Sequence, residues 1–527
     1  MSTPPAEARS IPHRERRRSL LDIGGPNSIN NFASSYTRAQ QYIGSTLIEQ
    51  GGSLIGDISR EASIGHEQEE EPGEFVGRES FGRFNFPATP ITDEIDEEAI
   101  AFEETPLLSP QISRISTKRG SFSIITGNST VPQTVFNSVN TLVGIAMLTL
   151  PFGFKLSGWL FGTILMLVTA IFSNITAKYL GRILRSHPHL STYGDIAHAY
   201  GGPYFSYFVT FFFIFDLTGA SLTLIILFAD SFSIIWPHIR TLKMVIVGLI
   251  FLMSLLPLHI LSIFSLLGIL ATMCIIIVIV ACGFLSDQQP GSLIFPEATS
   301  MFPPAWKNLL FSLGIFMAPW GGHPVFPELY RDMRHPDKFS RTSNVSFSVT
   351  FILDILIGIL GYLMFGGMVD DSIVKSIMNN PHYPSYINSI LCIIMGILPI
   401  SKLPLVTKPI ITSYENILGL TPKYVIMDKE GKLLETYGIK RILCRAIFFG
   451  LLLALALLFT SFGKLVAFLG SAICFTVCLA LPLLFYLKLN RNNIGPIHAI
   501  IIKIGIVVFL AAAIIGTYAS IAMETPK

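Results

Sequence analysis

The sequence has little charge for its length. Of its 527 residues, 14% are Asp, Glu, Lys or Arg, whereas 51% are hydrophobic and the mean hydropathy is +0.57. Soluble domains carry about 25% charged residues, so this composition indicates an integral membrane protein. The net charge of +2 averages two unlike regions, because residues 1–129 hold 12 Lys/Arg against 19 Asp/Glu, whereas residues 130–527 hold 25 against 16.

Cysteine is also scarce, and all six cysteines fall within apolar segments, where we expect small core residues rather than disulfides. Cys474 and Cys478 lie one helical turn apart, but no His or carboxylate stands beside them, so a metal site is not predicted. The sequence lacks the phosphate-binding pattern GxxxxGK[ST], which argues against ATP as the energy source. It also lacks a plausible nucleophile and base pair. We therefore expect no enzyme, no cofactor and no nucleic-acid partner.

Residues 1–129 have no long apolar run and are rich in Ser, Glu, Pro and Gly. Such a segment cannot bury enough surface to offset its chain entropy, so a disordered tail is predicted. No apolar stretch follows its basic cluster, so no secretory signal peptide is expected. The hexamer EETPLL places Glu103 four residues before Leu107 and Leu108. This acidic dileucine pattern is typical of cargo that clathrin-type adaptors sort to lysosome-like compartments.

The rest of the chain is predicted to cross a bilayer eleven times. Each apolar segment is close to the ~20 residues that a helix needs to cross the hydrocarbon, and lipid leaves helices as the way to pair every backbone group. The predicted spans are 132–155, 158–184, 204–231, 243–259, 262–285, 306–328, 342–366, 384–410, 441–461, 464–488 and 498–522. The loops on the side of the tail hold 13 Lys/Arg against 6 on the opposite side, which predicts a cytosolic N-terminus and a lumenal or external C-terminus.

Two of these spans contain helix breakers. The first span includes FNSVNTLVGIAMLTLPFGF (Phe136 to Phe154), and the sixth includes SLGIFMAPWGGHPVFPEL (Ser312 to Leu329). Interrupted helices at equivalent places in two five-helix sets indicate an inverted-repeat transporter. We predict one repeat over 130–285, a second over 286–490, and an added eleventh span in 491–527. Two helices merely kinked for packing are the alternative.

The breaks have a chemical use. Unwinding frees amide N–H groups at the start of the second half-helix and carbonyl groups at the end of the first. The freed N–H groups suit a carboxylate and the freed carbonyls suit an ammonium, so the pair fits the zwitterion of an amino acid. We expect the carboxylate to bind backbone at Gly144, Ile145, Ala146 and Met147. We expect the ammonium at Met317, Ala318, Trp320 and Gly321, with Asn140 orienting either end.

The sequence resembles the amino acid/auxin permease family over roughly 130–522. The resemblance is carried by NxxxGxxxLxLPxGF in the first span, SxYGDIAHAYG (Ser191 to Gly201), FDLTGASLTLIILFADS (Phe215 to Ser231), WGGHPVFPELYRDMRHPDKF (Trp320 to Phe339) and ISKLPLVTKPI (Ile400 to Ile410). It is strongest to fungal vacuolar amino-acid importers and to vesicular inhibitory amino acid transporters. It implies an eleven-helix fold of the amino acid–polyamine–organocation type and proton/amino-acid antiport.

Ionisable groups inside membrane spans are candidates for proton coupling. Lys402 is the first choice, because the resemblance places the eighth span opposite the first break, where sodium-coupled relatives hold an ion. His323 stands beside the sixth-span break, and Asp216 and Asp354 lie within the third and seventh spans. Each of them has a structural alternative, such as a permanent ion pair or a capped helix end.

The segment from Tyr330 to Arg341 mixes charges of both signs just after the sixth span. It could latch onto the tail or onto Tyr193 and Asp195 in the loop after the second span, and a plain interfacial charge cluster is an equal alternative.

The predicted function is therefore a vacuolar proton-coupled antiporter that moves neutral amino acids from the cytosol into the lumen. Two alternatives remain: a vacuolar exporter working by proton symport, and an amino-acid sensor that signals through its tail. A channel is disfavoured, because two broken helices around a closed site are not a ring of polar pore residues.

Overall fold

The computed structural model describes residues 112–115, 122–125, 127–256, 258–418, 420, 426–427, 433–434 and 438–522. These residues fall into two compact units. The smaller contains the antiparallel strands β1 (Ile112–Ile115) and β2 (Phe122–Ile125), and the larger contains everything described from residue 127 onward. The predicted sorting signal at Glu103, Leu107 and Leu108 lies outside the described residues.

The larger unit is almost entirely helical, as the composition predicted. Besides the two-residue strands β3 (Ile426–Met427) and β4 (Leu433–Leu434), it contains α2 (Val131–Leu142), α3 (Leu150–Ser186), α4 (Tyr193–Phe232), α5 (Ile239–Met253), α6 (Leu258–Leu285), α7 (Trp306–Met317), α8 (Phe326–Asp332), α9 (Phe339–Phe365), α10 (Ile373–Asn379), α11 (Ser385–Ile417), α12 (Ile439–Leu458), α13 (Phe462–Leu469), a π-helix (Gly470–Ala480), α14 (Leu481–Leu489) and α15 (Pro496–Ala522). Within the described residues, nine segments are long and apolar enough to cross a membrane.

The difference between nine segments and the predicted eleven spans has two local causes. The helix α5 has only 15 residues, although it is apolar. The range of α3 covers two helical segments that meet at a kink at Gly158, whose φ is 70°, and the amides of Trp159 and Leu160 donate to the carbonyls of Ser300 and Met301 at 3.1 Å instead of to their own helix. A side chain at Gly158 would meet the backbone of Met301 and Phe302 at 2.7 Å, so glycine is required there both for conformation and for space. Gly158 therefore marks where the first predicted span ends and the second begins.

Helix boundaries follow capping residues that can be read in the sequence. The side chain of Thr130 accepts a hydrogen bond from the Gln133 amide and closes a capping box before α2, and Thr192 does the same with Asp195 before α4. Gly366, with φ of 49°, ends α9. The helix α11 continues to Ile417, beyond the end of the predicted eighth span at residue 410.

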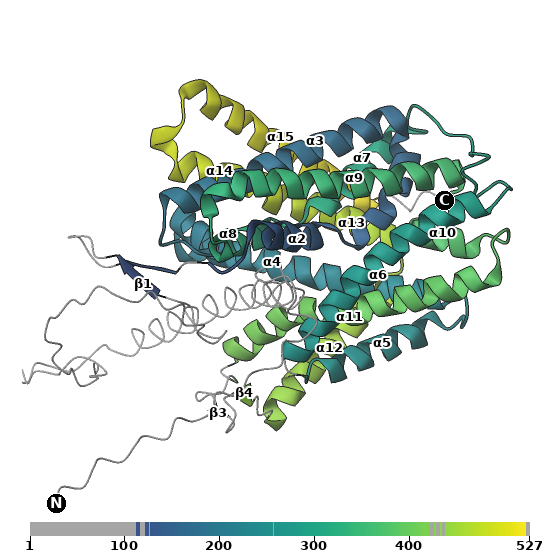
Figure 1. Cartoon of the computed structure of the whole chain (residues 1–527), viewed down its shortest axis with the longest axis horizontal. Helices are drawn as coiled ribbons and strands as arrows, with labels where there is room; N and C mark the ends of the chain where they lie inside the picture. The colour runs from purple at the N-terminus through teal and green to yellow at the C-terminus, as the bar shows by residue number, and fades with distance from the viewer. Residues whose placement is uncertain are drawn as a thin grey trace, which may run out of the picture. The chain divides into compact units, whose positions relative to one another are not determined.

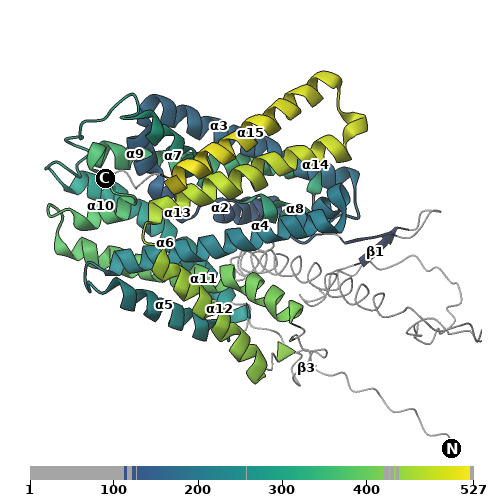
Figure 2. The same ribbon diagram turned by 180° about the vertical axis from the view of Figure 1, so that it is seen from behind.

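Most helices of this unit belong to two groups, and α2 and α8 lie between them. Figures 1 and 2 show α5, α6, α11 and α12 side by side along one edge of the helical unit, with α14 and α15 at the opposite edge. In both views α2 and α8 lie near the middle. The helix α3 packs against α7 and α9, whereas α11 packs against α4 and α6. The two interrupted predicted spans therefore lie between the two groups.

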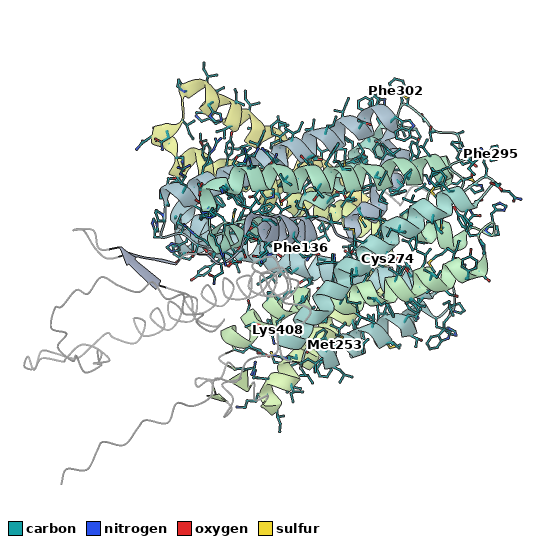
Figure 3. All side chains as sticks on the ribbon, viewed as in Figure 1. Phe136, Met253, Cys274, Phe295, Phe302 and Lys408 are labelled. Atoms are coloured by element: carbon teal, nitrogen blue, oxygen red, sulfur yellow. The ribbon has the colours of Figure 1, made fainter. Side chains whose placement is uncertain are left out.

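The helical unit has two ends, which we name the Thr130 end and the Gly158 end. At the Gly158 end, the loop between α6 and α7 lies over α9, with the amides of Gly291 and Glu297 donating to carbonyls of that helix at 2.7 and 2.9 Å. Phe295 and Phe302, labelled in Figure 3, belong to this loop and are exposed. The Lys155 ammonium also donates to the Val369 carbonyl at 2.8 Å, so loops cover this end.

A buried ionic cluster joins α11, α12 and the end of α5 near the Thr130 end. Glu415 on α11 accepts from Arg445 at 2.6 Å and from Arg441 at 2.7 Å, both on α12. Arg445 also donates to the Ser254 carbonyl, just after α5. Glu415 and Arg445 are each only 1% exposed. Removal of one partner from such a cluster leaves a buried charge uncompensated, which costs about 3–5 kcal/mol.

Candidate functional site

The first break lies between α2 and α3. The helix α2 ends at Leu142, and both Val143 (φ −71°, ψ 101°) and Gly144 (φ −134°, ψ −165°) are extended. A 3₁₀ turn then runs over Ile145–Thr149 and leads into α3. The helix is therefore interrupted at the glycine that the sequence indicated. The amides that begin the 3₁₀ turn and the carbonyls that end α2 lose their helical partners here.

The second break is a series of tight turns between α7 and α8. Short 3₁₀ turns cover Ala318–Trp320 and His323–Val325, and Gly321 between them has φ of −70° and ψ of 20°. The Gly322 amide donates to the Trp320 carbonyl at 2.9 Å. The prediction of two interrupted helices is therefore confirmed, although the chain at the second break stays more tightly wound than at the first.

Glycine allows the segment before the second break to pack closely on the tenth predicted span. A Cβ atom on Gly314 would lie 1.9 Å from the Ala467 carbonyl oxygen, and a Cβ atom on Gly470 would lie 1.9 Å from the Gly314 carbonyl oxygen. Neither position admits any side chain without a shift of backbone. The close approach brings the π-helix, and Cys474 on it, next to the second break.

A cavity of about 180 Å³ lies between the two breaks, and we name it the inner cavity. From the first break, Gly144, Ile145 and Ala146 line it, and from the second break, Ala318, Pro319 and Gly321 do so. The remaining walls come from α2, α4, α13 and the π-helix. They are formed by Thr141, Leu142, Asp216, Ala220, Thr223, Val466, Leu469 and Cys474.

A second cavity of about 230 Å³, the outer cavity, shares four of these residues: Thr141, Asp216, Ala220 and Gly321. Its other walls lie nearer the Thr130 end, because they come from α2 before its break, from Phe213 and Leu217 of α4, from the chain after the second break, and from the second half of α11. They include Asn140, Pro324, Val325, Lys402, Val406 and Pro409. The two cavities are thus adjacent, with the outer cavity on the side of the inner cavity that faces the Thr130 end.

Lys402 stands at the first break. Its ammonium donates to the carbonyl of Val143, the extended residue that follows α2, with an Nζ–O distance of 3.4 Å. A carbonyl freed at the end of a helix carries partial negative charge, which favours a cation. Lys402 also lines the outer cavity. The eighth predicted span therefore faces the first break, as the family resemblance implied.

Asp216 lies where the two cavities meet, since it lines both of them. The other two predicted proton-coupling residues, His323 and Asp354, do not line either cavity and are fully buried. The Nε2 atom of His323 lies 3.0 Å from the Ser173 carbonyl oxygen, which can only accept, so Nε2 carries the hydrogen. It also lies 2.9 Å from the Thr176 hydroxyl. Neither carboxylate oxygen of Asp354 has a hydrogen-bond partner in the described part of the chain.

Three predicted substrate residues are buried behind the cavity wall rather than on it. Met147 and Met317 pack in the core. The indole N–H of Trp320 donates to the Thr169 hydroxyl at 3.1 Å, and its ring stacks on Phe347 at 5.7 Å between centroids. The Thr169 oxygen in turn lies 3.1 Å from the Phe316 carbonyl. Trp320 therefore braces the second break instead of lining the cavity.

Sequence reasoning missed several residues that line the inner cavity, notably Thr141, Thr223 and Cys474. Cys474 was expected to be a core residue, and it is buried, but it also forms part of the cavity wall. The cysteine on α6, Cys274, is instead exposed and is labelled in Figure 3. The position of Thr141 next to Asn140 could have indicated that it lines the site. To place Cys474 on the cavity wall, one must know how the tenth span packs.

The charged segment from Tyr330 to Arg341 contacts residues that differ in part from those expected, and its role as a latch stays a prediction. The Ser129 hydroxyl donates to Asp332, and the Ser129 amide donates to the Asp332 carbonyl at 2.7 Å. Arg331 donates to backbone carbonyls near the end of α3, including that of Leu184 at 3.0 Å. The expected partners have other roles, because Tyr193 donates to the Val477 carbonyl and Asp195 caps its own helix.

Comparison with known proteins gives related sequences and similar structures. Amino acid transporter AVT1B of Arabidopsis thaliana is 27% identical over 423 residues, 76% of this chain and 73% of that protein. Amino acid transporter AVT1D of the same plant is 28% identical over 406 residues, 74% of this chain and 69% of that protein. The crystal structure of MhsT in complex with L-phenylalanine has a TM-score of 0.41 at 12% identity, covering 73% of this chain and 98% of that one. A manganese transporter of Eremococcus coleocola has the same TM-score and identity, covering 74% and 88%.

The family comparison is more extensive. The sequence model of the family described as transmembrane amino acid transporter protein matches residues 127–522. The match begins at the first described residue of the helical unit and ends with α15. It confirms the resemblance to the amino acid/auxin permeases and the expectation that the protein is not an enzyme. The chain belongs to the transmembrane amino acid transporter family.

Proposed function

We propose that the protein is a proton-coupled antiporter that moves neutral amino acids from the cytosol into an acidic, vacuole-like organelle. The observation that carries this proposal is the inner cavity, whose opposite walls are the backbone of two broken helices. Among the described residues, Asp216 is the one charged side chain that lines it. Two opposed backbone segments suit a zwitterion and keep fixed charges in the bilayer few, each of which costs about 2.5–3.5 kcal/mol or more.

The amino acid would bind with its carboxylate at the first break and its ammonium at the second. The amides of Ile145 and Ala146 begin a turn after an extended glycine, where an anion is favoured. Ala318 and Gly321 present backbone on the opposite wall. Met147, Met317 and Trp320, which we expected to touch the substrate, would instead hold these two backbone segments in place.

Proton coupling would centre on Lys402. Its ammonium lies against the Val143 carbonyl, where a sodium ion would be held by backbone in a cation-coupled transporter. A lysine in a confined apolar place can lose its proton, whereas an arginine holds its proton permanently. His323 and Asp354 remain second candidates, since both are buried beside the second break or in the seventh predicted span.

The direction of transport is inferred from the position of the outer cavity. The outer cavity lies on the side of the inner cavity that faces the Thr130 end, and the loops at that end hold more Lys and Arg. That side is cytosolic by the positive-inside rule. The substrate would therefore enter from the cytosol and leave after the Gly158 end opens. The Arabidopsis relatives are named amino acid transporters, which agrees with this substrate class.

The test is uptake of labelled amino acids into vesicles with an acidic lumen, with the Thr130 end outside, using a panel of neutral, acidic and basic substrates. Neutral amino acids should accumulate, and a protonophore should abolish accumulation. Lys402→Arg should reduce accumulation at least tenfold, because the guanidinium cannot release its proton. Lys408→Arg, on the same helix but outside both cavities, is the matched control and should accumulate normally.

The other outcomes identify the alternatives. Efflux of preloaded amino acid, driven by the acidic lumen, would indicate an exporter that works by symport. Saturable binding without any flux would indicate a sensor. Accumulation that persists after the pH gradient collapses would contradict proton antiport even though the family assignment stands.

A further inference from the structure

Asp216 holds a position that the zwitterion site alone does not explain. It is the one acidic side chain that lines either cavity among the described residues, and it lines both. The other titratable groups on the cavity walls are Lys402 in the outer cavity and Cys474 in the inner cavity. A carboxylate, a lysine and the substrate site therefore share one connected space.

The charged groups on the helices around α4 are held elsewhere or lie off the cavities. Lys243 of α5 donates to the carbonyls of Ala456 and Phe459 at 2.6 and 3.0 Å. Arg445 of α12 is paired with Glu415. The other basic groups on neighbouring elements are Arg240, Lys375, Lys408, Lys440, Arg441, Lys464, Lys488 and His323, the other thiols are Cys392, Cys444 and Cys478, and none of them lines a cavity. Lys402 is thus the cation that shares a cavity with Asp216.

An ionised carboxylate within a membrane span needs a nearby positive charge. Lys402 lines the outer cavity together with Asp216, and in the inference drawn below its ammonium supplies that charge when no substrate is bound. When an amino acid binds in the inner cavity, its ammonium provides a second cation to the same carboxylate. Two cations then compete for one counter-charge, and Lys402 is the one that can become neutral by releasing a proton.

We propose that Asp216 is the shared counter-charge through which the ammonium of the bound amino acid displaces the proton of Lys402. This proposal rests on the proposed function and gives its coupling a mechanism. In the step, one N–H bond of the Lys402 ammonium breaks and the proton passes to water in the outer cavity. A neutral amine remains beside the Val143 carbonyl. The substrate carboxylate is held by the first break, where the half-helix dipole offsets its charge.

The experiment measures proton release when substrate binds to the purified full chain in lipid nanodiscs. L-alanine, L-leucine and L-glutamine are titrated in turn in weakly buffered solution containing a pH indicator, and binding is measured in parallel. The wild type should release about one proton per bound amino acid. Asp216→Asn should release at least tenfold less and bind more weakly, and Asp216→Glu should restore release.

The matched control is Asp230→Asn, which removes a carboxylate from the same helix outside both cavities and should release protons as the wild type does. Lys402→Arg provides a second readout that does not require Asp216 to be altered. Its permanent cation should abolish proton release and weaken binding at least tenfold, because the substrate must compete for Asp216 with a charge that cannot leave.

The outcomes separate this inference from the proposed function. Full proton release by Asp216→Asn, or unweakened binding by Lys402→Arg, would overturn the role of Asp216 while leaving antiport intact. A wild type that binds amino acids without releasing protons would contradict both. A thermal midpoint for Asp216→Asn equal to that of the wild type confirms that the variant is folded.

Discussion

The two breaks differ in how far the backbone leaves the helix. At the first break, Val143 and Gly144 are both extended, and the chain separates α2 from the turn that follows. At the second break, Gly321 and Gly322 stay near helical values, and successive 3₁₀ turns keep the chain wound. The sixth span nevertheless contains more glycine and proline over its interrupted part. The number of helix breakers therefore does not determine how open a break is.

What surrounds each break accounts for the difference. The carbonyl of Val143 accepts a hydrogen bond from the ammonium of Lys402, so this carbonyl is paired although its residue is extended. The carbonyl of Phe316 is met by Thr169, which also accepts from Trp320, so the second break is braced from α3. A backbone group freed within a membrane must be paired again by neighbours. At the first break, the freed carbonyl is paired by the Lys402 ammonium, which would lose its charge on deprotonation. At the second break, the freed carbonyl is paired by the Thr169 hydroxyl, which does not change its charge.

The largest expected effect concerns the segment before the second break. Gly314→Ala should destabilise the protein by about 3 kcal/mol, at the upper end of overpacking costs, because its Cβ would meet a backbone oxygen at 1.9 Å. Gly144→Ala should cost less than about 1 kcal/mol. Its Cβ would lie 3.9 Å from the nearest atom, and its φ of −134° is open to any residue. Thermal unfolding of the two variants in the same detergent measures the difference.

Equal loss of stability in the two glycine variants would contradict the tighter packing of the second break. A midpoint of Gly314→Ala equal to that of the wild type would mean that α7 and the tenth span do not approach as closely as the structure has them. Gly470→Ala provides an independent check, since it introduces the reciprocal clash with the Gly314 carbonyl oxygen.

The second prediction uses a native cysteine beside the second break. Cys474 lines the inner cavity, and its sulfur lies 3.3 Å from the position of a Cβ on Gly321. A bound amino acid between the breaks should therefore slow alkylation of Cys474 by N-ethylmaleimide at least tenfold. Mass spectrometry of the Cys474 peptide, with and without saturating substrate, measures the rate.

Cys392 serves as the internal control in the same digest. It is buried on α11, within 3.4 Å of the Ser231 carbonyl and away from both cavities, so substrate should not change its labelling. Protection of Cys392 and Cys474 alike would indicate a general tightening of the protein. A Cys474 rate that is unaffected by substrate would remove the inner cavity as the binding site.

Much of the fold was predictable because lipid restricts the chain to helices and because breakers and caps are local signals. The interruptions near Gly144 and Gly321, the cap at Thr130 and the membrane segments all follow from short stretches of sequence. The reversal at Gly158 was harder to place. It depends on a loop about 140 residues later, whose Met301 and Phe302 backbone leaves space for glycine alone.

The site was predictable only in part, because it too depends on contacts between segments that are distant in the sequence. Backbone at Gly144 and Gly321 lines the cavities, as do Asn140, Asp216 and Lys402. The register of distant helices, which places Cys474 and Thr223 on the cavity wall and turns Trp320 away from it, cannot be read from local patterns. The helix positions of these residues were clear, but the face that each presents depends on packing with other spans.

The third prediction loosens the brace of the second break. Trp320→Phe keeps an aromatic ring against Phe347 but removes the N–H that donates to Thr169, which should cost about 1 kcal/mol. The break should then open more often, and Cys474 should be alkylated about fivefold faster without substrate. Trp306→Phe, at the exposed start of α7, should leave the rate unchanged. An unchanged rate in Trp320→Phe would mean that the indole does not brace the break.

The smallest expected effect lies on the α2 side of the first break. Asn140 lines the outer cavity but not the inner one, so it should contact the amino acid on its way in rather than in its final place. Asn140→Ala should therefore raise the apparent dissociation constant no more than about threefold, which corresponds to roughly 0.6 kcal/mol. Equilibrium binding of L-leucine to the purified variant measures it. A loss of tenfold or more would place the substrate beside Lys402 in the outer cavity, and the two breaks would then contribute unequally to binding.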